Sequence, residues 1–360
     1  MARVVYGISG EGSGHSSRAR EVMGHLVRQG HDVLGVSYDR GYENLADDFE
    51  MFETEGLHIA SADNKVSIVR TFVENLKKLG GGARKVDELR AVFKQRRPDC
   101  VITDFEPMTA YLARRYDLPL VSIDNQHRMR YMRFRCPQGL QKDALLTKTV
   151  IRLMVPWPDV ALITTFFFGE VTRERALLFP PILRREVLDV EPSSGEHVLA
   201  YFTKDFASFV EILRGFPRER FVVYGTGRAG TDGNLRFEGF SREGFLCDLA
   251  AARAVVATAG FTLITESLYL GKPYFALPMR GQFEQELNAH LLEDAGYGRN
   301  GRRATAETLG DFLYRLPEYR ERLGAYRHEG NQAILEKLDE LLVDGAAPLR
   351  AMQRRAGVGR

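Results

Sequence analysis

The sequence predicts an α/β protein with two Rossmann-like domains in tandem. Short apolar runs alternate with helix-length amphipathic stretches, a pattern typical of parallel sheets covered by helices. The alternation is interrupted between Ala176 and Glu196, where a Pro-Pro pair and a Ser-Ser-Gly run predict a linker, and it then restarts. A chain of 360 residues is long enough for two domains, each with its own core.

The expected elements follow from these runs in chain order. In the first domain, residues 1–187, we expect strands Arg3–Ile8, Asp32–Val36, Cys100–Thr103, Leu120–Ile123 and Ala161–Phe167, and helices Ser17–Gln29, Ser67–Leu79, Val86–Arg96 and Pro107–Tyr116. In the second, residues 188–343, we expect strands His197–Thr203, Arg220–Gly225, Ala254–Ala259 and Pro273–Leu277, helices Asp205–Arg214, Arg242–Ala252, Thr262–Leu270 and Gln285–Ala295, and two helices between Thr305 and Val343. The final helix is a candidate to pack back on the first domain, and residues 344–360 are expected to form a loosely ordered basic tail.

Composition narrows the class of protein. The net charge of +2 implies no polyelectrolyte partner, so we expect no nucleic-acid binding. Three widely separated cysteines argue against a disulfide framework or a metal knuckle and fit a reducing cytoplasm. The N-terminus does not read as a signal peptide, and no stretch reaches the roughly 18 to 20 apolar residues of a membrane span. We expect a cytoplasmic protein, soluble or associated with the inner face of the membrane; its oligomeric state stays open.

A glycine-rich loop, Gly7-Ile8-Ser9-Gly10-Glu11-Gly12-Ser13-Gly14-His15, follows the first expected strand. Glycines allow a ligand to approach the backbone closely, and the next helix offers its positive N-terminus. A dinucleotide-binding loop would need a third glycine at position 15, which is histidine. A tight turn with a histidine that caps the helix is the structural alternative.

A second ligand-binding pattern is Ala259-Gly260-Phe261-Thr262-Leu263-Ile264-Thr265-Glu266. A strand ends, Gly260 makes the turn, and the free N–H groups of the following helix suit a pyrophosphate. Glu266 lies one helical turn beyond Thr262, where its carboxylate can accept both hydroxyls of a ribose. Glu284 and Gln285, at the start of the next helix, can hold sugar hydroxyls.

Both patterns resemble segments of GT-B glycosyltransferases of families 1 and 28. The string GxGxGHxxR, which ends at Arg18, is similar to the N-terminal loop of the peptidoglycan N-acetylglucosaminyltransferase and of the UDP-sugar hydrolase of pseudaminic acid biosynthesis. The run from Ala259 to Ala289 resembles the donor-binding half of these enzymes. The resemblance implies two domains with parallel sheets facing across a cleft, with the acceptor in the first and a nucleoside-diphosphate sugar in the second.

The resemblance also implies the roles of single residues. His15 would be the general base toward the acceptor hydroxyl. Asp104 ends another expected strand, and because parallel strands end at one crevice it can meet His15 there and fix its tautomer. For Asp104 and Glu106, a helix cap or a solvated carboxylate is the alternative. Donor contacts are implied for Gly14, Thr203, Phe240, Gly260, Phe261, Thr262, Glu266, Glu284 and Gln285, and acceptor-side contacts for Gly12, Ser13, Glu106, Asn125 and His127. The loop at Thr203 lacks the family's glycines, and Phe240 could equally be a core aromatic.

The expected activity is metal-independent transfer with inversion, UDP being the expected donor nucleotide, and no cofactor. The histidines do not cluster, and the Glu-x7-Glu pattern of retaining families is absent because Thr258 stands eight residues before Glu266. A nucleotide-sugar hydrolase and a non-catalytic nucleotide-sugar binding protein are the alternatives. A nicotinamide dehydrogenase is disfavoured because the loop lacks its third glycine.

The acceptor side carries basic residues interleaved with apolar ones. The run 128–135 has four arginines and no acid, and the apolar helix expected at Ala144–Met154 adds Lys148 and Arg152. Such a pattern suits an anionic bilayer surface, which favours a lipid-linked or apolar acceptor. Contact is expected through Arg128, Arg130, Arg133 and Arg135; a solvated loop followed by a core helix is the alternative.

Overall fold

The chain divides into two compact units. The computed structural model describes residues 1–56, 84–202, 209–239, 241–326 and 328–357. The first unit comprises Met1–Arg135, Lys142–Arg184 and Glu329–Arg360, and the second comprises Cys136–Gln141 and Arg185–His328. The expected helix Ser67–Leu79 lies outside the described residues. The second unit ends at His328 rather than at residue 343, so the end of the chain belongs to the first unit.

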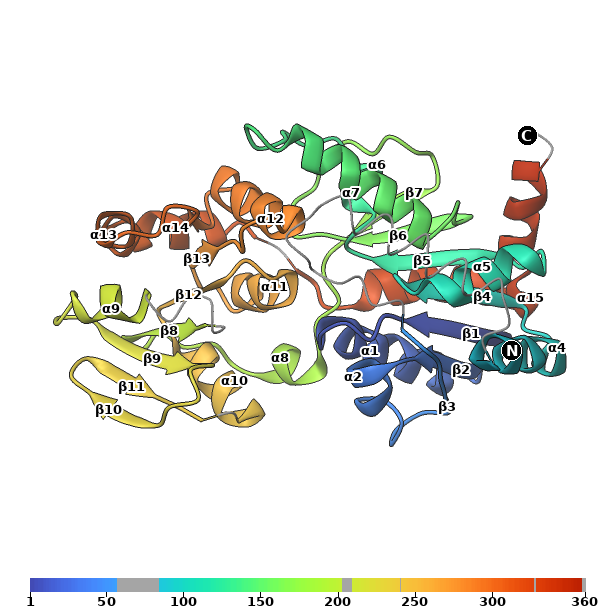
Figure 1. Cartoon of the computed structure of the whole chain (residues 1–360), viewed down its shortest axis with the longest axis horizontal. Coiled ribbons are helices and arrows are strands. Elements are labelled where there is room, and N and C mark those ends of the chain that lie inside the picture. The colour runs from blue at the N-terminus through green and yellow to red at the C-terminus, as the bar shows by residue number, and fades with distance from the viewer. Residues whose placement is uncertain (57–83, 203–208, 240, 327, 358–360) are drawn as a thin grey trace. The chain divides into compact units, whose positions relative to one another are not determined.

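The described part of the first unit contains a parallel sheet of seven strands (Figure 1). In pairing order these are β3 (Met51–Glu53), β2 (Asp32–Ser37), β1 (Arg3–Ile8), β4 (Cys100–Asp104), β5 (Leu120–Asp124), β6 (Val160–Thr164) and β7 (Ala176–Phe179). The strand order reverses between β1 and β4. In open α/β sheets, ligands bind beyond the carboxyl ends of the strands at this reversal.

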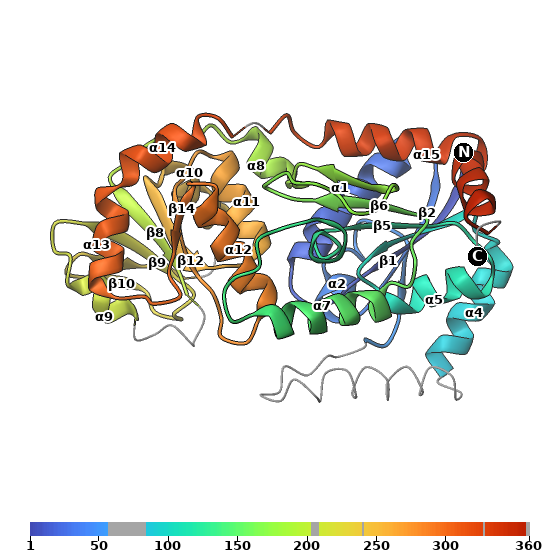
Figure 2. The same cartoon turned by 90° about the horizontal axis from the view of Figure 1, so that it is seen from above.

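Helices cover both faces of this sheet (Figure 2). They are α1 (Gly14–Arg28), α2 (Asp39–Glu43), α4 (Arg84–Arg96), α5 (Pro107–Arg115), α6 (Arg128–Tyr131), α7 (Gln141–Met154) and α15 (Gln332–Gly357). Val4 and Tyr6 of β1 pack with α1 and α15, whereas Val5 packs with α4 and α5. Because both faces are buried, the strands are continuous apolar runs rather than alternating ones.

The expectation of a loosely ordered tail after residue 343 is wrong within the described residues. The chain is non-helical from Val343 to Ala346 and then continues as the second half of α15 to Gly357. Ala346 and Leu349 are fully buried in the first unit's core. The Arg350 guanidinium lies 2.7 Å from the carboxylate of Asp99. The arginines suggested a solvated tail, but the small and apolar residues spaced among them form a helix face that packs.

The second unit also contains seven strands in its described part. In pairing order these are β10 (Gly230–Asp232), β11 (Leu235–Phe237), β9 (Arg220–Tyr224), β8 (His197–Tyr201), β12 (Ala254–Thr258), β13 (Tyr274–Leu277) and β14 (Gly298–Asn300). The pairing of β10 with β11 is antiparallel and the others are parallel. The order reverses between β8 and β12, so a ligand site is expected beyond the carboxyl ends of these two strands.

Helices of the second unit are α8 (Arg185–Asp189), α9 (Phe209–Arg214), α10 (Arg242–Ala251), α11 (Phe261–Tyr269), α12 (Phe283–Asp294), α13 (Ala306–Tyr314) and α14 (Leu316–Leu323). The stretch Ala176–Glu196, expected to be a linker, contains β7 and α8. Where two helices were expected between Thr305 and Val343, the structure has α13, α14 and the first part of α15.

Candidate functional site

The glycine-rich loop connects β1 to α1 at the strand-order reversal of the first unit. The helix begins at Gly14, three residues earlier than expected, so His15 lies in its first turn. A Cβ atom at Gly10 would stand 2.2 Å from the carbonyl oxygen of Tyr38, and Gly12 has a φ of 73°. Both positions therefore require glycine. In the described structure, no side chain caps the N-terminus of α1, and Ser13 contributes only its carbonyl oxygen.

His15 and Asp104 are in direct contact. Nδ1 of His15 lies 2.6 Å from Oδ1 of Asp104, the last residue of β4. The His15 side chain is 13% exposed and that of Asp104 is fully buried. A carboxylate only accepts hydrogen bonds, so a 2.6 Å contact requires the proton on Nδ1 of the imidazole. Nε2 is then the free basic nitrogen of His15.

Arg18 binds the same carboxylate. Its Nε donates to Oδ2 of Asp104 at 2.8 Å, and its Nη2 donates to Oδ1 at 2.6 Å. Burial disfavours the Arg18 charge, but the charge of Asp104 and its hydrogen bonds outweigh this and raise the pKa of the guanidinium. Arg18 ends the motif GxGxGHxxR, but the motif alone does not indicate its role. Its spacing of three residues from His15, on one helix face, was the available signal.

Glu106 is the helix cap that the sequence left as an alternative. Its carboxylate accepts from the backbone N–H groups of Met108 and Thr109 at 2.8 and 2.7 Å, and from the Thr109 hydroxyl at 2.6 Å. These bonds fix the start of α5. Burial raises the pKa of Glu106, although the same hydrogen bonds oppose the change.

Asn125 and His127, both expected on the acceptor side, differ in position. Oδ1 of Asn125 accepts from Nη1 of Arg18 at 3.5 Å, which places Asn125 beside the His15–Asp104 pair. His127 is fully buried, and its Nδ1 lies 2.7 Å from Oδ2 of Asp124. Burial would raise the pKa of Asp124, but the charge and hydrogen bonds of His127 and a bond from Ser122 lower it to about 2. His127 therefore packs in the interior of the first unit.

The run of four arginines is only partly at the surface. Arg128 is fully buried, with its guanidinium carbon 6.0 Å from the ring centroid of Phe166. Arg130 is half-buried, and only Arg133 and Arg135 are exposed. The expected membrane contact through Arg128 is thus wrong, because α6 turns this side chain into the interior of the first unit. No helix in the described residues is both long and apolar enough to cross a bilayer.

The second candidate site follows β12 in the second unit. Gly260 precedes the first residue of α11, Phe261, and among the described residues no side chain caps this helix. The first turn of α11 also has no acidic residue. A Cβ atom at Gly260 would meet no described atom within 4 Å, so the described residues leave space beside the start of the helix. The N–H groups of a helix's first turn and the helix dipole favour an anion.

Glu266 lies one turn further along α11 and is 4% exposed. The pKa of Tyr274 is raised mainly by burial and secondly by the charge of Glu266. The Tyr274 hydroxyl donates to the carbonyl of Thr258, the last residue of β12, at 2.7 Å. The Glu266 charge thus acts on a hydroxyl that lies at the carboxyl end of β12. Thr262, on the same helix face, is half-buried.

The first turns of α12 contact the backbone at the ends of β12 and β13. Oε1 of Gln285 accepts from the backbone N–H of Met279 at 3.1 Å, which closes the turn after β13. Nδ2 of Asn288 donates to the carbonyl of Ala259 at 2.8 Å, and this contact was not expected. Glu284 is half-buried. The expected contacts at Thr203 and Phe240 fall on residues outside the described ranges.

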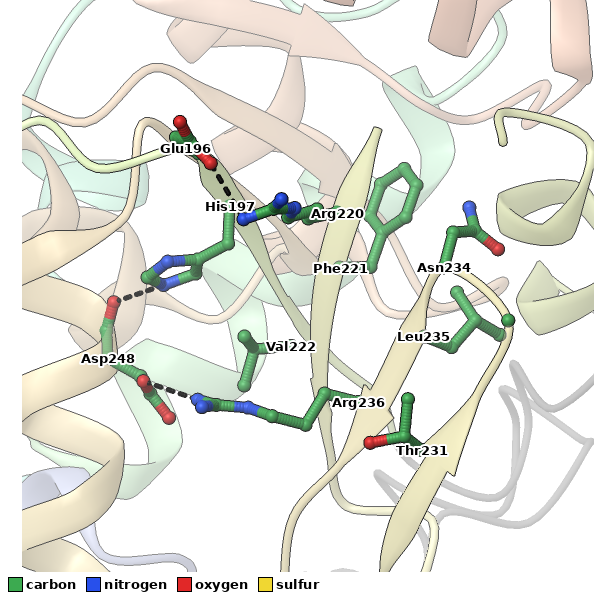
Figure 3. A pocket seen from close by; sticks show the side chains of 11 residues that line it. Glu196, His197, Arg220, Phe221, Val222, Thr231, Asn234, Leu235, Arg236 and Asp248 are labelled. Carbon is green, nitrogen blue, oxygen red and sulfur yellow. Dashed lines mark hydrogen bonds and ion pairs between the residues drawn. The ribbon is translucent and has the colours of Figure 1, made fainter. Parts of the chain in front are cut away.

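A cavity of about 520 Å³ lies elsewhere in the second unit (Figure 3). His197 and Arg220, the first residues of β8 and β9, line it, so it lies at the amino ends of the strands. Its charged groups bind one another: Arg220 lies 2.7 Å from Glu196, and Arg236 lies 2.8 Å from Asp248. The cavity is therefore separate from the turn at Gly260. The described residues contain no group of three His, Cys, Asp or Glu side chains placed to hold a metal ion.

Two Rossmann-like units, each with a mostly parallel sheet whose strand order reverses once, are the architecture of GT-B glycosyltransferases. The sequence model of glycosyl transferase family 1 matches residues 2–317, and the chain belongs to this family. Two proteins described as uncharacterized glycosyltransferases are similar in sequence. The Methanosarcina mazei protein is 24% identical, covering 94% of this chain and 98% of its own. That of Methanosarcina acetivorans is 22% identical, covering 82% and 85%.

Solved structures agree on the fold. The glycotransferase of kitacinnamycin has a TM-score of 0.68 at 19% identity, covering 94% of this chain and 98% of its own. A calicheamicin glycosyltransferase has a TM-score of 0.67 at 16% identity, covering 96% and 99%. A spinosyn rhamnosyltransferase solved with thymidine diphosphate has a TM-score of 0.63 at 13% identity, covering 94% and 100%. The enzyme class predicted from the two sequence patterns, a glycosyltransferase, is confirmed.

Proposed function

We propose that this glycosyltransferase moves a sugar from a nucleoside diphosphate to an acceptor hydroxyl with inversion, and that His15 is its general base. The observation that carries the proposal is the 2.6 Å contact between Nδ1 of His15 and Oδ1 of Asp104. Asp104 holds the proton on Nδ1, so that Nε2 is free to accept one. Asp104 also stabilises the imidazolium that forms when Nε2 is protonated.

The proposed step is a single displacement. The acceptor oxygen attacks the anomeric carbon while Nε2 of His15 takes the hydroxyl proton. The bond from the anomeric carbon to the diphosphate oxygen breaks, and its electron pair leaves with the nucleoside diphosphate. One displacement inverts the configuration at the anomeric carbon.

The donor is proposed to bind the second unit through α11. Its N-terminus, which no described side chain caps, can take the charge of the diphosphate without a metal ion. The carboxylate of Glu266 would accept the ribose hydroxyls. UDP is our expected nucleotide. Thymidine diphosphate enters the test because the similar spinosyn rhamnosyltransferase was solved with it.

Nucleotide release from α-linked UDP-glucose, dTDP-glucose or GDP-mannose tests the proposal, with benzyl alcohol and 4-nitrophenol as acceptor probes. One donor should be consumed in an acceptor-dependent manner, turnover should persist with excess EDTA, and NMR should show a β-linked product. An α-linked product contradicts inversion, and loss of turnover with EDTA contradicts metal independence. Full-rate release without an acceptor favours the hydrolase, and binding without turnover favours the non-catalytic binding protein.

We also propose that the acceptor is apolar or lipid-linked and that the enzyme contacts an anionic membrane peripherally. The supporting residues differ from those first expected. Arg133 and Arg135 remain exposed, and Lys148 and Arg152 lie on the exposed side of α7. Leu145, on the same helix, is 69% exposed. Exposed basic residues near exposed apolar ones suit a bilayer surface.

A further inference from the structure

Asp104 is held by a second partner besides His15. The planar guanidinium of Arg18 contacts both carboxylate oxygens, Oδ2 through Nε at 2.8 Å and Oδ1 through Nη2 at 2.6 Å. Oδ1 is thus shared between Arg18 and the imidazole of His15. A two-pronged contact of this kind fixes the plane of a carboxylate as well as its position.

Burial makes this contact consequential. The side chain of Asp104 is fully buried and that of Arg18 is 6% exposed. A buried carboxylate tends to take up a proton unless an opposite charge and hydrogen bonds compensate for the lost water. Arg18 supplies that compensation, and Asn125 supports Arg18 with an acceptor 3.5 Å from Nη1.

We propose that Arg18 is a positioning residue for the general base: it fixes the place and plane of the Asp104 carboxylate, so that His15 keeps its proton on Nδ1 and presents Nε2. This inference rests on the proposed function of His15. Nη2 of Arg18 also lies 3.2 Å from Nδ1 of His15, but with the proton on Nδ1 both groups donate to Oδ1 of Asp104. Arg18 therefore acts through Asp104 and not on the substrate. Its loss should therefore impair only the reactions that need a base.

The two acceptor probes separate a base defect from a folding defect. Benzyl alcohol must lose a proton during attack, whereas 4-nitrophenol is already ionised at mildly alkaline pH and needs no base. With benzyl alcohol, kcat of Arg18→Met should fall by roughly 10²-fold, and that of Arg18→Lys, which keeps the charge but not the fork, by roughly 10-fold. With 4-nitrophenol, both variants should stay within about 5-fold of the parent enzyme.

Arg28→Met is the matched control, because Arg28 is exposed at the end of the same helix. It should match the parent with both acceptors. Equal losses of Arg18→Met with both acceptors, or no loss, overturn the inference. If Arg18→Met does not fold, as judged by its thermal transition, Arg18→Lys decides by the same comparison.

His15→Ala distinguishes this inference from the function on which it rests. It should lose roughly 10²- to 10⁴-fold with benzyl alcohol and little with 4-nitrophenol. If His15→Ala retains parent activity with benzyl alcohol, the proposed base is wrong and the role of Arg18 falls with it. If His15→Ala shows the selective loss and neither Arg18 variant does, only the inference about Arg18 is overturned.

Discussion

At the scale of single residues, Asp104 links the end of β4 to the helix that follows β1, because its carboxylate contacts both His15 and Arg18. The meeting of His15 and Asp104 could be predicted, because each follows a strand and parallel strands end at one edge of a sheet. The spacing of Arg18 from His15 places both on one helix face, but it does not predict the contact of Arg18 with Asp104. Arginine is rarely buried, and sequence spacing does not show whether a side chain turns toward a sheet or toward solvent.

For His127, the position in the chain could be predicted from the sequence, but its burial could not. The sequence placed it after β5, at the same edge as Asp104, and the structure confirms that placement in the chain. Its burial depends on the short helix α6 and on the ring of Tyr131, stacked at a centroid distance of 5.2 Å. A contact of this kind arises from tertiary packing and leaves no periodic signal.

Glu266 gives the prediction at this scale. Glu266→Ala should weaken binding of the accepted nucleoside diphosphate by about 1.5–3 kcal/mol, since a charged acceptor of two hydroxyl bonds is lost. That loss corresponds to roughly 10- to 150-fold in Kd by calorimetric titration. Glu307→Ala, at an exposed position in α13, is the control and should bind as the parent does.

Because Glu266 is buried beside Tyr274, unfolding without nucleotide must be measured in parallel. If Glu266→Ala is folded and binds the nucleoside diphosphate with the parent Kd, Glu266 is not part of the donor site.

At the scale of elements, the long buried strands and the helices after them were predictable. β1 and β4 appear with the expected starting residues, because they are bounded apolar runs. β7 was assigned to the linker: it has four residues and the Pro-Pro pair follows it directly. The three-residue strands β3, β10, β11 and β14 are too short for a pattern to identify.

The second half of α15 should stabilise the first unit. Leu349→Ala removes a fully buried side chain and should cost about 2–5 kcal/mol, the usual range for such a truncation. Chemical denaturation should show an earlier transition, whereas Arg354→Ala, at an exposed position of the same helix, should not. A chain that ends at Val343 should lose more stability than Leu349→Ala. If it unfolds like the parent, this part of α15 is not part of the core.

At the scale of the whole molecule, the proposed membrane contact predicts salt-sensitive association. The protein should sediment with vesicles of phosphatidylserine and phosphatidylcholine at low salt, since each basic residue near an anionic surface contributes about 1 kcal/mol. Changing Arg133, Arg135, Lys148 and Arg152 together to Gln should abolish sedimentation without changing donor affinity. Pure phosphatidylcholine vesicles are the control and should bind little. Absence of sedimentation with anionic vesicles at low salt would indicate a soluble acceptor.

The return of the chain's end to the first unit has a consequence for synthesis. The core beneath α1 includes Ile334, Leu338 and Leu349, which a ribosome adds after the second unit is complete. At a synthesis rate of about 5–20 residues per second, the apolar face of α1 stays without these partners for roughly 15–65 s. The second unit, whose main segment is Arg185–His328, can fold within that interval. Premature termination after residue 328 would therefore leave the earlier-made unit incomplete and the later-made one whole, the reverse of the usual order for a two-domain chain.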